Sequence, residues 1–256
     1  MVTPKTRRVL ITVKAYPNPS KTYGETVCCA GIDIDTPQWV RLYPIPFRDL
    51  DSSKKFKKYT VIKVRCWKAH DDHRVESYKV DADTIEKLTF LDTKQNWAKR
   101  KKIVLPALSP SFCKIREDIA QNKSLGIFKP TNIDFLWKKS PLENDAKRQA
   151  CYAQLSFFDT KKKAIEQIPF DFYYHFNCHN TADCPGHELP IIDWEIAQAY
   201  RDWQHKYKSE QLLLQKIKQR WLDLMCSEKN DVYFYVGNMK RFRDHFMVLG
   251  TFYPKK

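Results

Sequence analysis

Glycine is scarce in this sequence, with only 6 residues among 256. So few glycines exclude a collagen-like chain and Gly-rich linkers, and the sequence has no Gly-rich loop for nucleotide phosphates. No PD-(D/E)xK, HNH or Walker pattern and no Ser-His-Asp set can be completed from the residues present. These absences weigh against an enzyme, although they leave the question open.

Long apolar runs are also missing near the N-terminus. Residues 1–8 are basic, and the apolar run 9–13 ends at Lys14. A secretory signal needs about 7–15 apolar residues and a membrane-spanning helix about 20. We therefore expect a cytoplasmic protein without a membrane partner. Its 8 cysteines are then expected to be free thiols or metal ligands rather than disulfides.

Aromatic residues and positive charge are plentiful. Aromatics make up 14% and hydrophobic residues 43% of the chain, which excludes wholesale disorder. The net charge of +15 is typical of proteins that bind a polyanion, most often nucleic acid. Residues 151–200 differ, with three basic and seven acidic side chains. Such a window suits a metal or acid–base site inside a phosphate-binding surface, or it is a chance fluctuation of composition.

Two basic clusters enclose an aromatic ring. Phosphates bind to such charges, and unpaired bases stack on such rings, whereas a lysine run alone is usually a solvated surface. The two clusters are Lys54, Lys55, Phe56, Lys57 and Lys58, and Lys240, Arg241, Phe242 and Arg243. We expect both to contact DNA or RNA.

The first part of the chain alternates apolar and polar residues in short runs separated by turns. This pattern predicts strands over residues 9–13, 26–34, 38–43 and 59–67, with a Pro-containing loop over 14–25. Consecutive short strands of this kind are most simply a small β-barrel, which we assign to residues 1–108.

The middle of the chain and residues 109–256 have a mixed pattern. Helices are predicted over 83–91, 93–101 and 110–122, and over 193–225 with a break near Lys208 and Ser209. Strands are predicted over 126–137, 152–158, 169–176, 231–237 and 245–253. The predicted fold class is therefore α+β, with a small OB-like β-barrel in the N-terminal half and a mixed helical and strand C-terminal half.

Cysteine and histidine gather in one segment. Cys178 and Cys184 are followed by His187 at Cys-x-x-His spacing, and Pro185-Gly186 supplies the turn between the last two. A closed zinc site needs a fourth ligand, for which the sequence offers His175, His179 and the distant Cys151. We take His175 as the fourth ligand of a zinc site. The alternative interpretation is a pair of packed thiols with surface histidines.

Asp193 and Glu195 follow this segment at the predicted start of a helix. Asp193 is placed to cap the helix, and Glu195 lies in its first turn, where a negative charge suits the helix dipole. The functional alternative makes the two carboxylates metal ligands or acid–base groups of a metal-dependent, nuclease-like enzyme.

Hydroxyl groups, rings and arginines surround the first loop and its neighbouring strands. Base and phosphate recognition uses such side chains, here Lys14, Tyr16, Tyr23, Arg41 and Arg48. Barrel packing and solubility are the structural alternative.

Two motifs in this region resemble a known family. The run Cys28-Cys29-Ala30-Gly31-Ile32-Asp33 and the later Gln38-Trp39-Val40-Arg41 are similar to the opening of the dual OB-fold-containing domain family of bacterial conflict systems. The family more often places Pro directly after the arginine, whereas this chain has Leu42-Tyr43-Pro44. The resemblance covers about 35 residues and implies OB-like barrels and a nucleic-acid or nucleotide-binding role in bacterial defence. It implies no catalytic residues.

The function expected from the sequence is nucleic-acid binding, with phosphates held by Lys and Arg and bases by aromatic rings. One alternative is the metal-dependent nucleic-acid-processing enzyme that uses Asp193 or Glu195. Another is an assembly subunit of a nucleoprotein complex, whose charge serves contacts with other protein subunits.

Overall fold

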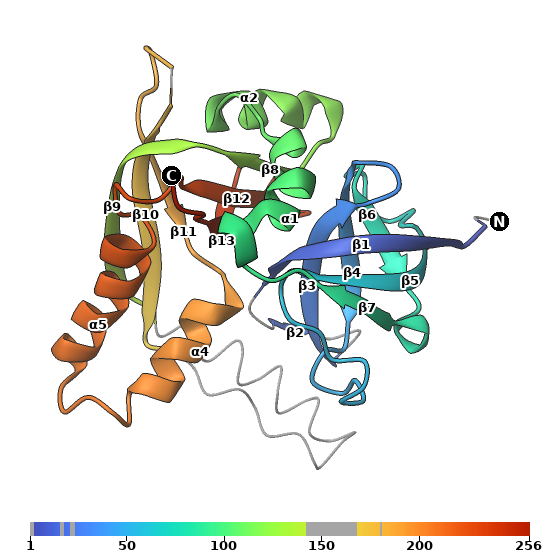
Figure 1. The fold of residues 1–256 in the computed structure, drawn as a ribbon, viewed down its shortest axis with the longest axis horizontal. Helices are drawn as coiled ribbons and strands as arrows, with labels where there is room; N and C mark the ends of the chain where they lie inside the picture. The colour runs from blue at the N-terminus through green and yellow to red at the C-terminus, as the bar shows by residue number, and fades with distance from the viewer. Residues whose placement is uncertain (1–2, 16–17, 21–23, 142–167, 180) are drawn as a thin grey trace.

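A computed structural model describes residues 3–15, 18–20, 24–141, 168–179 and 181–256. Its N-terminal half is a closed five-stranded barrel with the strand order β1-β3-β4-β6-β5, and the pairing of β5 with β1 closes it (Figure 1). Strands β4 and β6 run parallel, and the other neighbouring strands of the barrel run antiparallel. The strands are β1 (Lys5–Lys14), β3 (Gly24–Asp33), β4 (Trp39–Ile45), β5 (Thr60–Lys68) and β6 (Ser77–Val80). This arrangement confirms the predicted small barrel.

Two further strands extend the barrel sheet at its outside. Strand β2 (Asn18–Ser20) pairs with β3, inside the segment predicted to be a loop. Strand β7 (Glu86–Phe90) pairs with β5 after a 3₁₀ turn at Ala82–Thr84. The helix predicted over 83–91 is therefore wrong. Backbone pairing along β5 overrides the weak helical pattern of this short segment.

The C-terminal half contains two three-stranded sheets. One has the order β13-β12-β8, with β8 (Leu125–Phe128), β12 (Tyr233–Asn238) and β13 (Phe246–Phe252). The other has the order β11-β10-β9, with β9 (Pro130–Lys139), β10 (Phe170–Cys178) and β11 (His187–Pro190). The single strand predicted over 126–137 is two strands, because the chain passes from one sheet to the other at Lys129. The strand predicted over 152–158 lies outside the described residues.

The helices predicted over 93–101, 110–122 and 193–225 are confirmed. They are α1 (Lys94–Val104), α2 (Phe112–Glu117), α4 (Trp194–Trp203) and α5 (Glu210–Lys218). Short 3₁₀ turns follow α1 at Leu105–Ala107 and α2 at Asp118–Gln121, and α5 continues into a π-helical turn at Gln219–Leu224. The break between α4 and α5 falls at Ser209, whose hydroxyl caps α5 by accepting a hydrogen bond from the Leu212 amide. No helix in the described ranges is long and apolar enough to cross a bilayer.

A shared apolar core joins the two halves, which lie side by side in Figure 1. On β1, Val9 and Ile11 fill the barrel, whereas Leu10 and Val13 belong to a second cluster outside it. That cluster is completed by C-terminal side chains that include Tyr235 and Phe252. A third cluster fills the C-terminal half. The barrel and the C-terminal half therefore pack as one body.

Gly31 lies on β3 opposite Ile11 of β1, where there is no room for a side chain. A Cβ atom at this position would lie 2.0 Å from the Leu10 carbonyl oxygen, which is backbone and cannot move alone. We expect Gly31→Ala to lower the free energy of unfolding by about 2 kcal/mol or more, because the two strands must separate. Urea unfolding followed by tryptophan fluorescence measures this. An unchanged midpoint would show that the strands separate here without cost.

Candidate functional site

Four metal-ligating side chains of the C-terminal half meet at one point. They are Cys113 on α2, Cys178 at the end of β10, and Cys184 and His187 on either side of the turn into β11, and their ligand atoms all lie within 4.8 Å of one another. The sulfurs of Cys113 and Cys178 are 3.8 Å apart, and His187 Nε2 lies 3.3 Å from the sulfurs of Cys113 and Cys184. Tetrahedral zinc with bonds of about 2.3 Å would separate its sulfur ligands by about 3.8 Å. The cluster could therefore hold a metal ion.

Local sequence explains how these ligands are positioned. Gly186 has φ +78°, a left-handed conformation that glycine adopts without strain, and it turns the chain between Cys184 and His187. His187 then pairs with Phe176 across the β10–β11 ladder. On the other side, Ser111 caps α2 by accepting a 3.0 Å hydrogen bond from the Lys114 amide, which orients the helix that carries Cys113.

The titration of these groups follows from burial and from their proximity. Burial, reinforced by the neighbouring thiols, raises the pKa of Cys113 to about 12. Burial and the charge of Arg116 lower the pKa of His187, so its imidazole is neutral at pH 7 and can donate a lone pair to a metal. A bound cation would reverse the thiol shift, because it stabilises thiolates.

The fourth member of the cluster is Cys113, so the prediction that His175 completes it is wrong. His175 and Cys178 lie on the same strand at positions of opposite parity, and a strand alternates its side chains between its two faces. Cys178 is buried while His175 is exposed. His179 is also outside the cluster, and Cys151 lies outside the described residues. Cys113 precedes Cys178 by 65 residues, and no local spacing marks it as a ligand.

A cleft of about 350 Å³ lies between the barrel and the C-terminal half. Its barrel side comes from the end of β1, from β3, β4 and β6, and from the connection between β5 and β6. Its other side comes from Ile192, from β12 and β13, and from the turn between these two strands. Five basic and two acidic side chains line it, namely Arg41, Arg74, Lys79, Lys240 and Arg241, and Asp71 and Asp72. The cleft also contains Tyr43, Tyr78, Met239 and Met247.

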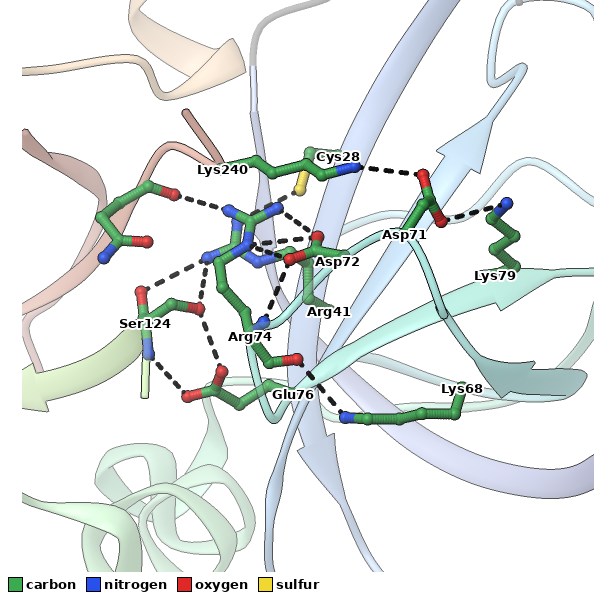
Figure 2. A network of polar contacts seen from close by, with 11 residues as sticks. Cys28, Arg41, Lys68, Asp71, Asp72, Arg74, Glu76, Lys79, Ser124 and Lys240 are labelled. Carbon is green, nitrogen blue, oxygen red and sulfur yellow. Dashed lines mark hydrogen bonds and ion pairs between the residues drawn. The ribbon is translucent and has the colours of Figure 1, made fainter. Parts of the chain in front are cut away.

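A buried polar network lies next to this cleft and includes Arg41, Asp72 and Arg74 of its lining (Figure 2). The Arg41 guanidinium donates to the Ser124 hydroxyl at 3.1 Å, and the Ser124 hydroxyl and amide donate to the Glu76 carboxylate at 3.0 and 2.8 Å. Arg74 is held by Asp72 and donates to the Asn238 carbonyl at 2.8 Å. These bonds cross from barrel to C-terminal half, so they fix the width of the cleft.

An ion pair spans the mouth of the cleft. Asp71, in the connection between β5 and β6, pairs with Lys240 from the β12–β13 turn and with Lys79, each at 3.1 Å (Figure 2). All three side chains are partly exposed. Lys240 and Lys79 therefore lie where an anion from solution could exchange with the Asp71 carboxylate.

Three polar atoms of residues that line the cleft have no hydrogen-bond partner within the described part of the chain. They are Arg41 Nε, a donor, Asn238 Oδ1, an acceptor, and the Ser77 hydroxyl, which can be either. Arg41, Ser77 and Asn238 are only 5%, 3% and 2% exposed, so bulk water has little access to these atoms. A buried unsatisfied group costs about 1–3 kcal/mol.

Several residues expected to bind nucleic acid are structural. Phe56 is 3% exposed and packs edge-on against Phe47, so it belongs to the barrel core and is not a stacking platform for bases. The Lys14 ammonium lies over the rings of Phe47 and Trp194, at 3.6 and 4.5 Å. Lys58 is buried beside Asp193 at 2.5 Å.

The remaining predicted residues have varied positions. Lys54 pairs with Asp83, and Lys55, Lys57 and Arg48 lie at the barrel surface away from the cleft lining. Tyr16 and Tyr23 lie outside the described residues. Phe242 is 55% exposed at the β12–β13 turn, next to Arg241, whereas Arg243 donates to Asn122 Oδ1 at 2.9 Å.

Asp193 has the capping role that the sequence predicts. It caps α4 by accepting a 3.0 Å hydrogen bond from the Glu195 amide, and it also pairs with Lys58. Burial raises the pKa of Asp193 to about 6, although Lys58 acts against this shift. Burial alone would lower the pKa of Lys58, but Asp193 and Glu195 outweigh it and raise that pKa. Both members of the pair are charged at neutral pH, and neither Asp193 nor Glu195 belongs to the metal cluster.

Residues 108–256, more than half of the chain, match the family described as Domain of unknown function (DUF8757). The chain belongs to the DUF8757 family. Residues 5–106 match a second family, described as Domain of unknown function (DUF8758). No curated protein matches the chain. The cluster of Cys113, Cys178, Cys184 and His187 lies wholly within the DUF8757 part, and the cleft lies between this part and the barrel.

The structural role of the buried Lys58–Asp193 pair can be tested by substitution. Asp193→Asn leaves the Lys58 ammonium buried with only the more distant Glu195, so we expect the free energy of unfolding to fall by about 3 kcal/mol. Glu195 is 57% exposed, and Glu195→Gln should change it by less than about 1 kcal/mol. Urea titration of both variants checks the difference. Equal effects would mean that Asp193 acts only as a helix cap.

Proposed function

We propose that the protein binds nucleic acid on the barrel face formed by β3 and β4 and in the cleft beside it. OB-like barrels bind oligonucleotides on the face of their second and third strands and through the loops that flank it. In this barrel the corresponding strands are β3 and β4, and the corresponding loop joins β5 to β6. The single observation that supports the proposal most is that the 350 Å³ cleft lies at this place.

The charges of the cleft agree with this proposal. Five of its seven ionisable Lys, Arg and Asp side chains are basic, and Lys79, Lys240 and Arg241 stand at its mouth. Phosphate oxygens bind such groups and give register on a strand without sequence information. Phe242, exposed beside Arg241, is the ring of the second basic cluster that remains available for stacking.

No observation favours the nuclease-like alternative, because Asp193 is already engaged with Lys58 and neither carboxylate reaches the metal cluster. The other alternative is an assembly subunit of a nucleoprotein complex. It differs from a nucleic-acid binder because it would show no steep salt dependence of affinity for a nucleic-acid strand. The resemblance to the dual OB-fold-containing domain family implies a role in bacterial defence. We propose that nucleic-acid binding takes place in that context.

We also propose that the Cys113, Cys178, Cys184 and His187 cluster binds zinc as a closed structural site. Three thiolates and one imidazole are a ligand set that zinc prefers in structural sites. Three thiolates also neutralise the charge of the ion and make it a weak Lewis acid, which suits a structural role. Bound zinc would tie α2 to the β10–β11 sheet.

The nucleic-acid proposal predicts a steep salt dependence. Affinity for a single-stranded 12-mer, measured by fluorescence anisotropy, should fall with rising salt at a log–log slope of about −0.7 per neutralised phosphate. Lys240→Glu with Arg241→Glu should weaken binding at least about tenfold and make the slope shallower. Lys208→Glu, an exposed charge change in the connection between α4 and α5, should have little effect.

Asp71→Asn should act in the opposite direction. It removes the carboxylate that Lys79 and Lys240 now contact, so affinity for the 12-mer should rise. A flat salt titration, or no binding at low salt, would contradict nucleic-acid binding and favour the assembly role.

The zinc proposal predicts one equivalent of zinc in purified protein, measured by elemental analysis. Cys113→Ser should release it and lower the thermal unfolding temperature, because structural metal binding contributes to folding. His175→Ala should keep the metal, and so should Cys226→Ser, which changes a cysteine outside the cluster. The proposal would be contradicted if purified wild-type protein contained no metal and unfolded at the same temperature as Cys113→Ser.

A further inference from the structure

The cleft changes character from its interior to its mouth. Ala30 and Leu249, which are 0% and 3% exposed, line its inner part. Lys240 and Arg241 are exposed at its mouth. A ligand that matches this lining has an apolar body and an anionic group at one end. At about 350 Å³ the cleft is at the small end of ligand pockets, so it suits a single small molecule or residue of a polymer.

The atoms without hydrogen-bond partners indicate which polar groups the apolar part of the ligand must carry. Asn238 Nδ2 donates to the Arg243 carbonyl at 2.7 Å, which fixes Oδ1 as the acceptor without a partner. Arg41 Nε supplies a donor in the same lining. A phosphodiester, or a fully ionised phosphate monoester, presents only acceptors, so it pairs with Arg41 but leaves Asn238 Oδ1 unpaired. The edge of a nucleobase carries donors and acceptors side by side and satisfies both.

We propose that the cleft holds one nucleotide, with its base inside near Arg41 and Asn238 and its phosphate at Lys240 and Arg241. This inference deepens the proposed nucleic-acid binding and rests on it. The nucleotide is either one unstacked residue of a strand or a free mononucleotide. In both cases the base, and not only the phosphate, contributes to affinity.

Methionine positions offer a direct test in the intact wild-type chain. Of the 4 methionines, Met239 and Met247 line the cleft, and Met225 is buried in the separate C-terminal core. In protein labelled with ¹³C at the methionine methyls, a nucleoside monophosphate should shift the signals of Met239 and Met247 through the ring current of its base. The Met225 signal is the internal control and should stay unchanged. Ribose 5-phosphate, which lacks a base, should not shift Met247.

A variant extends the test to the base contact. Arg41→Lys keeps the charge but removes Nε, and it also removes the guanidinium bonds to Ser124. We expect mononucleotide affinity to fall about tenfold while ribose 5-phosphate binding stays the same. Arg65→Lys makes the same change at an exposed position of β5 and should alter neither. Ser124→Ala, which weakens the contact with Arg41 but keeps Nε, should lower mononucleotide affinity less. Thermal unfolding of all three variants checks that they fold.

Binding of oligonucleotides shows whether the nucleotide comes from a nucleic-acid strand or is a free mononucleotide. It also distinguishes failure of this inference from failure of the proposed nucleic-acid binding. If a 12-mer with bases binds at least about tenfold more tightly than an abasic 12-mer, the cleft takes a base from a strand. If no strand binds at low salt but mononucleotides shift Met239 and Met247, nucleic-acid binding fails and the free nucleotide is the ligand. If both strands bind equally and mononucleotides leave these signals unchanged, the single-nucleotide site is overturned while nucleic-acid binding stands.

Discussion

Strand β1 has no solvent-facing side along residues 9–13, and this constraint determines how the rest of the molecule is arranged. Its backbone pairs with β3 and β5, one side-chain face fills the barrel, and the other packs against residues of β12 and β13. A strand buried on both faces requires the continuous apolar run that stands at this place in the sequence. Because β1 is shared, the barrel and the C-terminal half cannot separate without exposing the second core.

The sequence predicts the parts of the fold whose signal is local. Alternation along 59–67 and the helical spacing from Leu213 to Trp221 both identify elements that bury one face, and both are confirmed. Strand β7 escapes this reasoning, because all five of its residues are exposed and only pairing with β5 makes it a strand. The same distinction applies to the candidate metal ligands. Cys178, Cys184 and His187 lie close together in the sequence, so their spacing identifies them as a group. Cys113 joins them only through the packing of α2, which leaves no local signal in the sequence.

Positive charge predicts a partner class but not the residues that meet it. The same cluster of lysines contains Lys58, buried against Asp193, and Lys55, exposed at the surface. Phe56 between them is core, because its neighbour Phe47 covers it. At the β12–β13 turn the outcome is reversed, and Phe242 is exposed beside Arg241. Which ring of a basic cluster faces solvent depends on the tertiary contacts of its strand ends, and these have no signature in the composition.

The segment that follows α2 connects the Cys113, Cys178, Cys184 and His187 cluster to the cleft. The Asn122 carbonyl accepts a hydrogen bond from the Val75 amide, and the Ser124 amide donates to Glu76, so this segment holds the connection between β5 and β6. Its Asn122 side chain and Ile119 carbonyl accept from Arg243, which holds the turn between β12 and β13. Both sides of the cleft mouth are therefore anchored on one short segment. Because Cys113 lies on the helix just before that segment, an ion that fixes α2 would also fix the separation of the two sides.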